Sequence, residues 1–397
     1  MWTERMGNSI IKVLFLAFTG IMAIAVKSWE RFGDLITTTV FPQQEVIVST
    51  EASGSSIDSL VDVLPCKSIL IELSGILMKG AGIRDYYPGI NITDEGYNVG
   101  CYPQTSTDYE TEQMIRFKHY LDEKGIQLLY VNEPAKYIED TFYQKEFGRE
   151  SWLNRNADMF LKRIGEAGIN YIDLRENIRE EGLEPLSLFY RTDHHWTVPA
   201  SKWAAKIIAG RLNEDYGYHI DLHLYDDDRF YETVYRQAWL GEQGKKAAKS
   251  YIGMDDYVML EPVYATSYII TGMEEPIEGG FDIFIDKEIY DMEEDPYEAK
   301  SWHYSYQNHQ TYGIHNNCAD YGKVLVLGDS YEASMIPFLT LGIQDLRLVV
   351  LRSMKNQSIH EIIDKGDYDT VIIAYAQFMI GSHDNEENAN YRMFTLE

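Results

Sequence analysis

Cysteine is scarce in this chain, and so is positive charge. Its three cysteines, Cys66, Cys101 and Cys318, are too few and too dispersed for a zinc site or a disulfide framework, although one bridge between two of them stays open. Lysine and arginine number 35 against 63 acidic residues, which gives a formal net charge of −28. A surface this acidic repels phosphate backbones, so we expect no nucleic-acid partner.

Several signatures of cofactor chemistry are also missing. The chain has no glycine-rich phosphate loop and no dinucleotide fingerprint, so nucleotide chemistry has no support. It has no HExxH motif or comparable partner for a metal centre. We therefore expect neither a cofactor nor a metal.

The first sixty residues differ in character from the rest. Residues 13–26 carry no charge, and Lys12 and Lys27 bound this run. Its length is typical of a signal-peptide core and is short for a membrane span of about 20 residues. A cleaved signal and an uncleaved anchor are both consistent with it, and a buried core helix is a third interpretation. Either of the first two places the rest of the chain outside the cytoplasm, as a membrane-anchored or secreted cell-surface protein. The predicted division is a signal or anchor at 1–30, a linker at 31–64 and a folded domain at 65–397.

The folded part alternates helix and strand patterns. Helical spacing at 111–124 and 152–167 ends in each case at a glycine, Gly125 and Gly168, and a short apolar run follows each glycine. The order predicts parallel strands covered by helices. Runs at 324–327 and 371–374 are apolar on both faces, as central parallel strands are. The predicted strands are 67–73, 126–131, 169–174, 323–327, 346–351 and 370–374, and the further helices are 199–213, one from about 332, and 358–365.

Residues 215–320 break this rhythm. The segment is rich in Tyr, Asp and Glu, and short alternating stretches occur at 267–271 and 281–285. We predict an insertion that is partly β and that lines or covers a site.

Gly328-Asp329-Ser330-Tyr331 joins an apolar strand to a helical pattern. Ser330 would then lie at the carboxyl edge of the sheet and at a helix N-terminus, where unpaired backbone N–H groups can hold an oxyanion. We expect Asp329 to cap the helix, and the N–H groups of Ser330 and Tyr331 to be the oxyanion donors. An ordinary strand-to-helix turn is the competing interpretation.

Asp193-His194-His195-Trp196 supplies the groups that a serine nucleophile needs. In an extended loop Asp193 and His195 can turn to one side, so the carboxylate can orient the imidazole and the imidazole can serve as general base. We expect His194 to point elsewhere in a structural role, and Trp196 to fix the loop or to wall the pocket. A satisfied polar loop and a metal site formed by Asp193, His194 and His195 are the alternatives. Three further histidines, His303, His309 and His315, are interpreted as residues of the insertion, with possible substrate contacts at the first two.

These motifs resemble the DHHW family and the related alginate O-acetyltransferase proteins AlgX and AlgJ, in the SGNH hydrolase superfamily. The similarity rests on residues 191–197 and 328–331 and on their order, and it extends over about 65–397. It implies a flavodoxin-like three-layer α/β/α fold with a mostly parallel central sheet. It also implies Ser330 as nucleophile, His195 as base and Asp193 as orienting partner. Gln377 occupies the region where the superfamily has an Asn-like oxyanion donor.

The resemblance implies an extracytoplasmic serine-dependent O-acetyltransferase that modifies a cell-surface polysaccharide through an acyl-enzyme. A membrane O-acyltransferase would then supply the acetyl group, and the N-terminal segment would hold the chain at the membrane. Two alternatives use the same fold: a carbohydrate acetylesterase, and a non-catalytic glycan-binding surface protein whose tyrosines stack on sugars.

Overall fold

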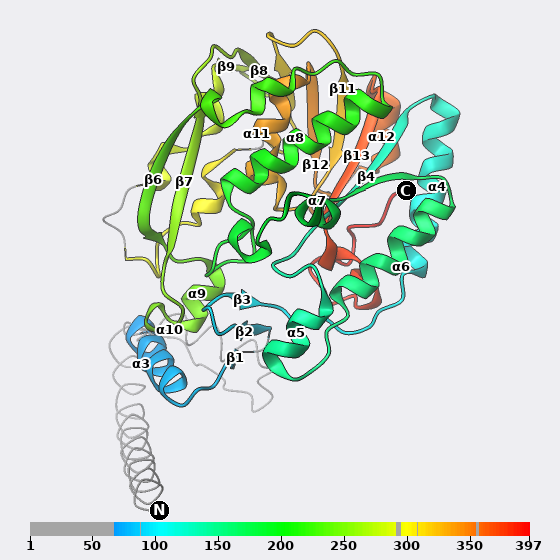
Figure 1. Cartoon of the computed structure of the whole chain (residues 1–397). Helices are drawn as coiled ribbons and strands as arrows, with labels where there is room; N and C mark the ends of the chain where they lie inside the picture. Colours follow the sequence, from blue (N-terminus) through cyan, green and yellow to red (C-terminus); the bar gives the residue numbers. More distant parts are fainter. Residues whose placement is uncertain (1–66, 88, 291–294, 308, 355–356) are drawn as a thin grey trace, which may run out of the picture. The chain divides into compact units, whose positions relative to one another are not determined.

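The computed structural model describes residues 67–87, 89–290, 295–307, 309–354 and 357–397 (Figure 1). The predicted signal or anchor and the linker lie outside the described residues. The folded unit is Cys66–Glu397. Within the described ranges, no helix combines the length and the apolar character needed to cross a bilayer.

The core of the molecule is an eight-stranded sheet in the order β5-β4-β13-β11-β12-β10-β8-β9. The five strands from β5 to β12 are parallel, and the other three pair antiparallel. Strands β11 and β13, inside the parallel part, are almost wholly buried, as their uninterrupted apolar runs predict. The strands are β4 (Gln127–Glu133), β5 (Asn170–Asp173), β8 (Tyr268–Thr271), β9 (Ile277–Gly279), β10 (Gly313–Asn316), β11 (Lys323–Leu327), β12 (Asp345–Val349) and β13 (Thr370–Ala376).

Helices cover both faces of this sheet. Tyr130 of β4 meets Phe160 of α6 edge to face, with ring centroids 5.2 Å apart. Glu133 lies three residues further along the same strand, so its side chain points to the opposite face of the sheet. There it lies against Glu332 at the start of α11. The expected three layers are therefore present. The helices are α4 (Asp108–Lys124), α5 (Asp140–Phe147), α6 (Leu153–Glu166), α7 (Leu174–Glu181), α8 (Val198–Asp215), α9 (Glu242–Ala247), α10 (Lys249–Ile252), α11 (Glu332–Leu339) and α12 (Ile359–Lys365).

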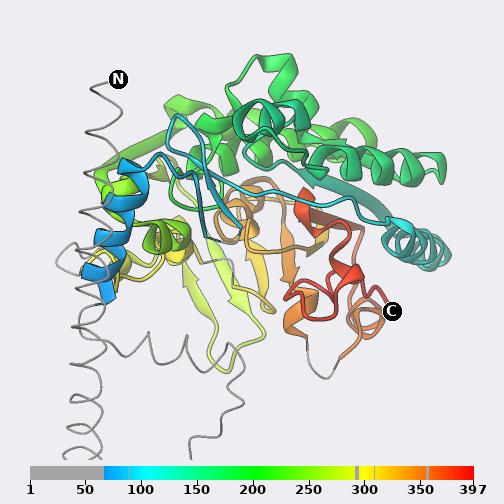
Figure 2. The ribbon, with the colours of Figure 1, turned by 90° about the horizontal axis from the view of Figure 1, so that it is seen from below.

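The predicted insertion at 215–320 is partly β, but it is not a separate flap. Strands β8, β9 and β10 extend the central sheet. Strands β6 (Phe230–Trp239) and β7 (Asp255–Pro262) form a two-stranded ribbon beside it (Figure 1; Figure 2). The strand predicted at 281–285 is wrong, because Phe281–Phe284 is a short 3-10 helix. Its Phe281 and Phe284, three residues apart, are both buried, and that spacing suits a helical turn.

The strand predicted at 67–73 is also wrong, because Lys67–Gly80 forms helix α3. A short apolar run fits either structure, and tertiary contacts decide here. Gly75 packs so closely on Ala248 that an added Cβ would lie 2.3 Å from the Ala248 Cβ. A small three-stranded sheet follows, formed by β1 (Asp85–Tyr87), β2 (Ile90–Ile92) and β3 (Asn98–Val99).

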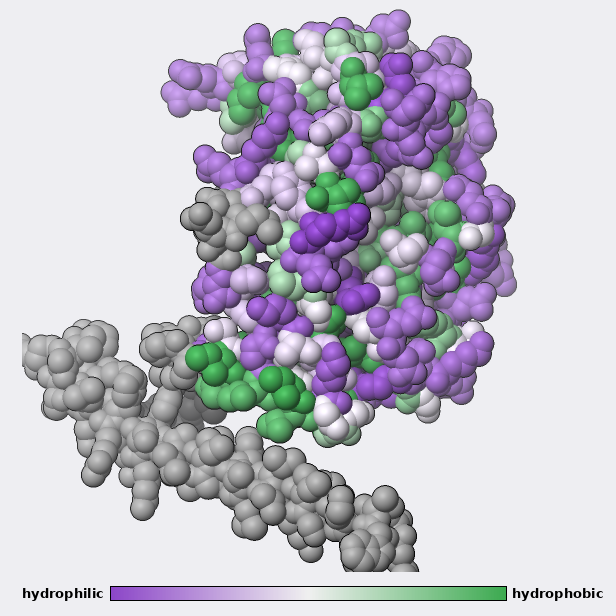
Figure 3. Space-filling view, turned by 60° about the vertical axis from the view of Figure 1, so that its left-hand side comes forward, coloured by the Kyte–Doolittle hydropathy of each residue, from purple (hydrophilic) through white to green (hydrophobic). Residues whose placement is uncertain are grey.

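The outer face of α3 is apolar and exposed. Five of its aliphatic side chains have exposed fractions of 47–61%: Ile69, Leu70, Leu73, Ile76 and Leu77. Figure 3 shows a hydrophobic patch (green) at the lower edge of the described surface, next to the grey atoms. We call these five residues the α3 patch.

Candidate active site

The turn that carries Ser330 is held in place by its own neighbours. Strand β11 ends at Leu327 and α11 begins at Glu332, so Ser330 lies at the carboxyl edge of the sheet. Asp329 accepts hydrogen bonds from Tyr331 N and from Ala376 N, both at 2.9 Å. These bonds stabilise the turn before α11 and tie it to the end of β13, whereas the expected cap is not formed, because Tyr331 is the N-cap residue and α11 has no side-chain cap hydrogen bond.

The loop that carries the two histidines is equally constrained. The carboxylate of Asp255 accepts from the backbone nitrogens of Arg191 at 2.6 Å and Thr192 at 2.8 Å. Trp196 is buried, and its Nε1 donates to Tyr331 O at 3.1 Å. The hydroxyl of Tyr331 donates to His194 O at 2.8 Å. Trp196 therefore fixes the loop, and these two reciprocal bonds join it to the serine turn.

Ser330, His195 and Asp193 meet in one hydrogen-bonded chain. His195 Nε2 lies 2.8 Å from Ser330 Oγ, and His195 Nδ1 lies 2.6 Å from Asp193 Oδ1. The other carboxylate oxygen of Asp193 accepts from Glu242 N at 2.9 Å. Because the carboxylate faces Nδ1, the ring proton belongs on Nδ1, and the lone pair of Nε2 faces the serine hydroxyl. This is the arrangement that general-base activation of a serine requires.

Burial sets the charge state of this chain. It lowers the pKa of His195 to about 4, with a further lowering by His194 and an opposing effect of Asp193. Burial by itself would raise the pKa of Asp193, but the attraction of and hydrogen bond to His195 outweigh it, so that pKa is well below the usual range. At neutral pH the carboxylate is ionised and the imidazole is neutral and able to accept a proton.

One predicted oxyanion donor already has a hydrogen-bond partner. The N–H of Tyr331 donates to Asp329 Oδ1, so it is already used within the turn. The expectation that a helix start leaves its first N–H groups free did not allow for an aspartate two residues earlier. The hydroxyl of Tyr304 lies near the Ser330 side chain. Burial raises the pKa of Tyr304, and a hydrogen bond with the Ser330 side chain acts in the opposite direction.

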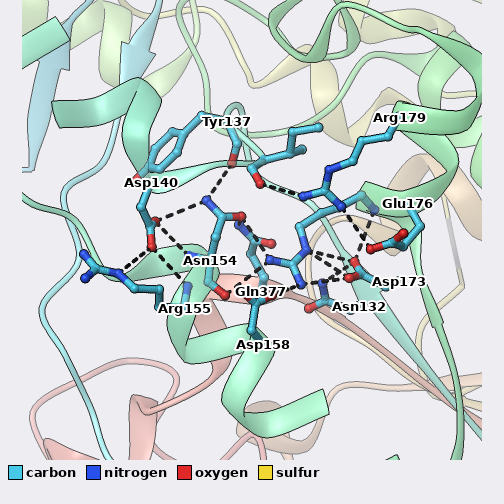
Figure 4. A network of polar contacts seen from close by, with 12 residues as sticks. Asn132, Tyr137, Asp140, Asn154, Arg155, Asp158, Asp173, Glu176, Arg179 and Gln377 are labelled. Carbon is cyan, nitrogen blue, oxygen red and sulfur yellow. Dashed lines mark hydrogen bonds and ion pairs between the residues drawn. The ribbon is translucent and has the colours of Figure 1, made fainter. Parts of the chain in front are cut away.

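Gln377 does not take the oxyanion position either. It follows β13, as expected, but its Nε2 donates to Asn154 Oδ1 at 3.3 Å. Figure 4 shows it within a buried polar network in which Asn132 Nδ2 also donates to Asp173 Oδ1, at 3.0 Å. Arg175 binds the same Asn154 oxygen at 3.2 Å. Gln377 is thus part of the support between β4, β5 and α6.

His303, which the sequence suggested only as a possible substrate contact, lies against His195. Its ring stacks on that of His195 with centroids 3.6 Å apart and an angle of 12°. Its Nε2 donates to the backbone oxygen of Ser330 at 2.6 Å. Burial holds the pKa of His303 well below its usual range, so the ring is neutral. By contrast, His309 bonds Ile283 O and His315 bonds Asp345, and neither contact involves the serine turn.

Three carboxyl groups lie buried together at the serine turn, one from the turn itself, one from the start of α11 and one from the end of β4. Glu133, Asp329 and Glu332 have exposed fractions of 0%, 1% and 0%. Burial raises the pKa of all three, and repulsion from neighbouring carboxylates of the cluster adds to this at Glu133 and Glu332, whose pKa values lie well above the usual range. At least one of them therefore keeps its proton at neutral pH. We call these three residues the carboxyl cluster.

Two groups of described residues bring possible metal donors together. One is Asp193, His194 and His195, and the other is the carboxyl cluster; within each group the donor atoms lie within 4.8 Å of one another. In the first group the Nδ1 atom of His195 faces the carboxylate and its Nε2 faces Ser330, so its donors are already engaged in hydrogen bonds. That set does not complete the four-ligand shell of a zinc site.

The comparisons with known proteins agree with this architecture. Residues 102–223 match a family model described as "SGNH hydrolase-like domain, acetyltransferase AlgX". This stretch contains Asp193 and His195, and Ser330 lies outside it. None of the curated proteins matches the chain.

Solved structures extend the similarity over most of the chain. PatB1 of Bacillus cereus has a TM-score of 0.60 at 15% identity, over 78% of this chain and 99% of PatB1. The same protein with a sulfonyl adduct gives a TM-score of 0.59 at 15% identity, over 77% and 99%. A DHHW family protein from Eubacterium siraeum gives 0.52 at 15% identity, over 77% and 95%. The resemblance and the SGNH-type α/β fold expected from the motifs are confirmed.

Proposed function

We propose that this chain is a serine-dependent O-acetyltransferase that acts outside the cytoplasm on a cell-surface polysaccharide. The hydrogen-bonded chain Ser330–His195–Asp193 carries this proposal, because it places a hydroxyl, a neutral base and an ionised carboxylate in line at the sheet edge. The match to an SGNH hydrolase-like domain named for an acetyltransferase supports the reaction class.

Each step of the reaction has a group in place. Ser330 Oγ attacks the acetyl carbonyl carbon while His195 Nε2 takes its proton, and Asp193 stabilises the resulting imidazolium. The imidazolium then returns the proton to the departing oxygen of the donor, which leaves an acetyl ester on Ser330. A sugar hydroxyl next gives its proton to His195 and attacks that ester. Ser330 leaves with the proton, and the acetyl group remains on the sugar.

His303 has a positioning role in this scheme. Its hydrogen bond to Ser330 O fixes the backbone of the nucleophile, and its ring supports the plane of His195. A neutral aromatic ring stacked on an imidazole also favours the imidazolium that forms when the serine proton moves.

Two features support a location at a membrane surface. The uncharged run at 13–26 is the length of a signal or anchor core, and the α3 patch exposes five aliphatic side chains on one helix face. Exposed apolar patches of this kind mark contacts with membranes or proteins. A membrane O-acyltransferase is the proposed acetyl donor. Recovery of the chain in the cytosolic fraction of cells would contradict this location.

Product analysis with an activated acetyl ester, with and without polysaccharide, tests the function. We expect acetyl groups on the glycan with the wild-type chain and none with Ser330→Ala. Release of free acetate at the same rate whether or not glycan is present would support the acetylesterase instead. Glycan binding without acetyl turnover in either chain would support a non-catalytic binding protein.

A further inference from the structure

A cavity of about 240 Å³ lies beside the proposed nucleophile. Its wall includes His194 and Tyr331, which directly precede His195 and follow Ser330 in the chain. The ring of His194 contacts that of His195, with centroids 3.9 Å apart and 37° between the planes, and the His194 side chain is 38% exposed. The cavity therefore adjoins the chain neighbours of Ser330 and His195, although neither of these two residues lines it.

Polar atoms without partners point to a ligand in this cavity. Asn98 is 4% exposed, and its Oδ1 has no hydrogen-bond partner among the described residues. The backbone of Asn98 is fixed, because its N–H donates to Arg191 O at 3.0 Å. Gln243 Oε1 is likewise buried and unpaired, while its Nε2 donates to His194 Nδ1 at 3.0 Å. Two acceptors held in place without donors match a ligand that brings hydroxyl groups.

The loop after β4 adds a donor residue, Lys136, to the lining of the cavity. Lys136 is 3% exposed, and its Nζ donates to Arg191 O at 3.3 Å. Burial lowers its pKa to about 7, although Asp255 and Asp193 favour the charged form. Burial thus weakens the positive charge of this lysine, and the two carboxylates offset part of what remains. With a net charge of −28 on the whole chain as well, the cavity favours a neutral ligand over an acidic one.

Aromatic rings form the apolar part of the wall. Tyr102 and Phe378 both line the cavity, and their rings are nearly parallel, with centroids 6.2 Å apart and 13° between the planes. A pyranose has an apolar C–H face and hydroxyls around its edge, so it can cover a ring while its hydroxyls reach Asn98 and Gln243. A few placed polar groups in an otherwise apolar wall are typical of small-ligand sites.

We propose that this cavity is an acceptor subsite that binds one neutral pyranose residue of the glycan, next to the residue whose hydroxyl reaches Ser330. The proposal rests on the proposed function and narrows its substrate to polysaccharides with uncharged sugar units. The polar contacts come from Asn98, Gln243 and Lys136, and the stacking surface comes from Tyr102 and Phe378.

The test separates the two half-reactions in the full chain purified in detergent. The variants are Asn98→Leu, which removes an acceptor, and Phe378→Ala, which removes a stacking surface. Tyr231→Ala is the matched control, because this ring lies on β6 and is 63% exposed. For each chain, the rate of Ser330 acetylation by a small activated ester reports folding and the nucleophile. The kcat/KM for transfer to β-linked tetramers of glucose, of N-acetylglucosamine and of a uronic acid reports the subsite.

We expect Ser330 acetylation within about twofold of wild type in all three variants. Transfer to the better neutral tetramer should fall about 10-fold or more in Asn98→Leu and Phe378→Ala, the size of one lost contact, and stay unchanged in Tyr231→Ala. Unchanged transfer in both cavity variants, or a preference of the wild type for the uronate tetramer, overturns the subsite and leaves the acetyltransferase intact. Absence of Ser330 acetylation in the wild type overturns the proposed function and the subsite together.

Discussion

The carboxyl cluster under the serine turn makes wild-type stability depend on pH in a definite direction. In the folded chain the pKa of Glu133 is raised well above its usual range, by burial first and then by Glu332 and Asp329. In the unfolded chain the same group loses its proton near pH ~4.3. Above that pH the folded state holds a proton that the unfolded state has released, so folding becomes less favourable as the pH rises. This loss of stability is absent at acid pH and grows with pH until the pKa of Glu133 in the folded chain is passed.

Glu133→Gln removes this dependence with little change of shape. Each pH unit between the unfolded and the folded pKa costs the wild type up to ~1.4 kcal/mol. The amide keeps a donor for Glu332, so the substitution leaves the neighbouring carboxylate a partner. We expect the variant to gain ~1–3 kcal/mol in the free energy of unfolding relative to wild type between pH 5 and pH 8.

Denaturant unfolding at both pH values, in the presence of a chelator, measures this gain. Glu123→Gln, an exposed residue on α4, is the control and should show the same difference from wild type at the two pH values. Titrating groups outside the carboxyl cluster are common to wild type and variant and cancel in the comparison. A Glu133→Gln difference that is independent of pH, or that becomes more unfavourable at pH 8, would refute the reasoning.

Two further substitutions probe the support of the catalytic loop. Gly241→Ala should lower the acylation rate of Ser330 about 100-fold and destabilise the fold by ~1–3 kcal/mol, because the new Cβ would lie 2.5 Å from Asp193 Cβ. Gly210→Ala, inside α8 with its nearest neighbour at 3.9 Å, should instead stabilise by ~0.5–1 kcal/mol in thermal unfolding. His303→Phe keeps a stacked ring but loses the bond to Ser330 O, so acylation should slow about 10-fold with an unchanged dependence on ester concentration. Wild-type rates in Gly241→Ala or His303→Phe would contradict these roles.

The sequence predicted the parallel part of the fold because its signals there are local. Gly125 ends α4 at a φ of 71°, and the apolar runs of β11 and β13 have the length and burial of central strands. Prediction failed where tertiary contacts decide. Helix α3 depends on the close approach of Gly75 to Ala248, and nothing within residues 67–73 encodes that neighbour. The union of β8 and β10 with the main sheet is likewise a long-range pairing.

The candidate site shows the same division. Asp193, His195 and Ser330 could be named from two short motifs, and the structure brings them within hydrogen-bond reach. His303 could be named only as a possible substrate contact, because its position against His195 arises from the folding of the insertion, which has no regular pattern. The tyrosine- and histidine-rich segment around Trp302 was the one available signal. Two predicted oxyanion donors, the N–H of Tyr331 and the amide of Gln377, are already hydrogen-bonded, and such bonds are not visible in a motif.

Covalent labelling by a small sulfonyl fluoride tests the central claim most directly, since the reagent reacts with activated serines and the adduct is stable. Intact mass and peptide mapping should find one adduct per chain, on Ser330. The rate should fall at least 100-fold in His195→Ala, and in wild type its rise with pH should be complete well below pH ~6.5, because burial lowers the pKa of His195 to about 4. An unlabelled Ser330, or labelling at the same rate without His195, would contradict the account.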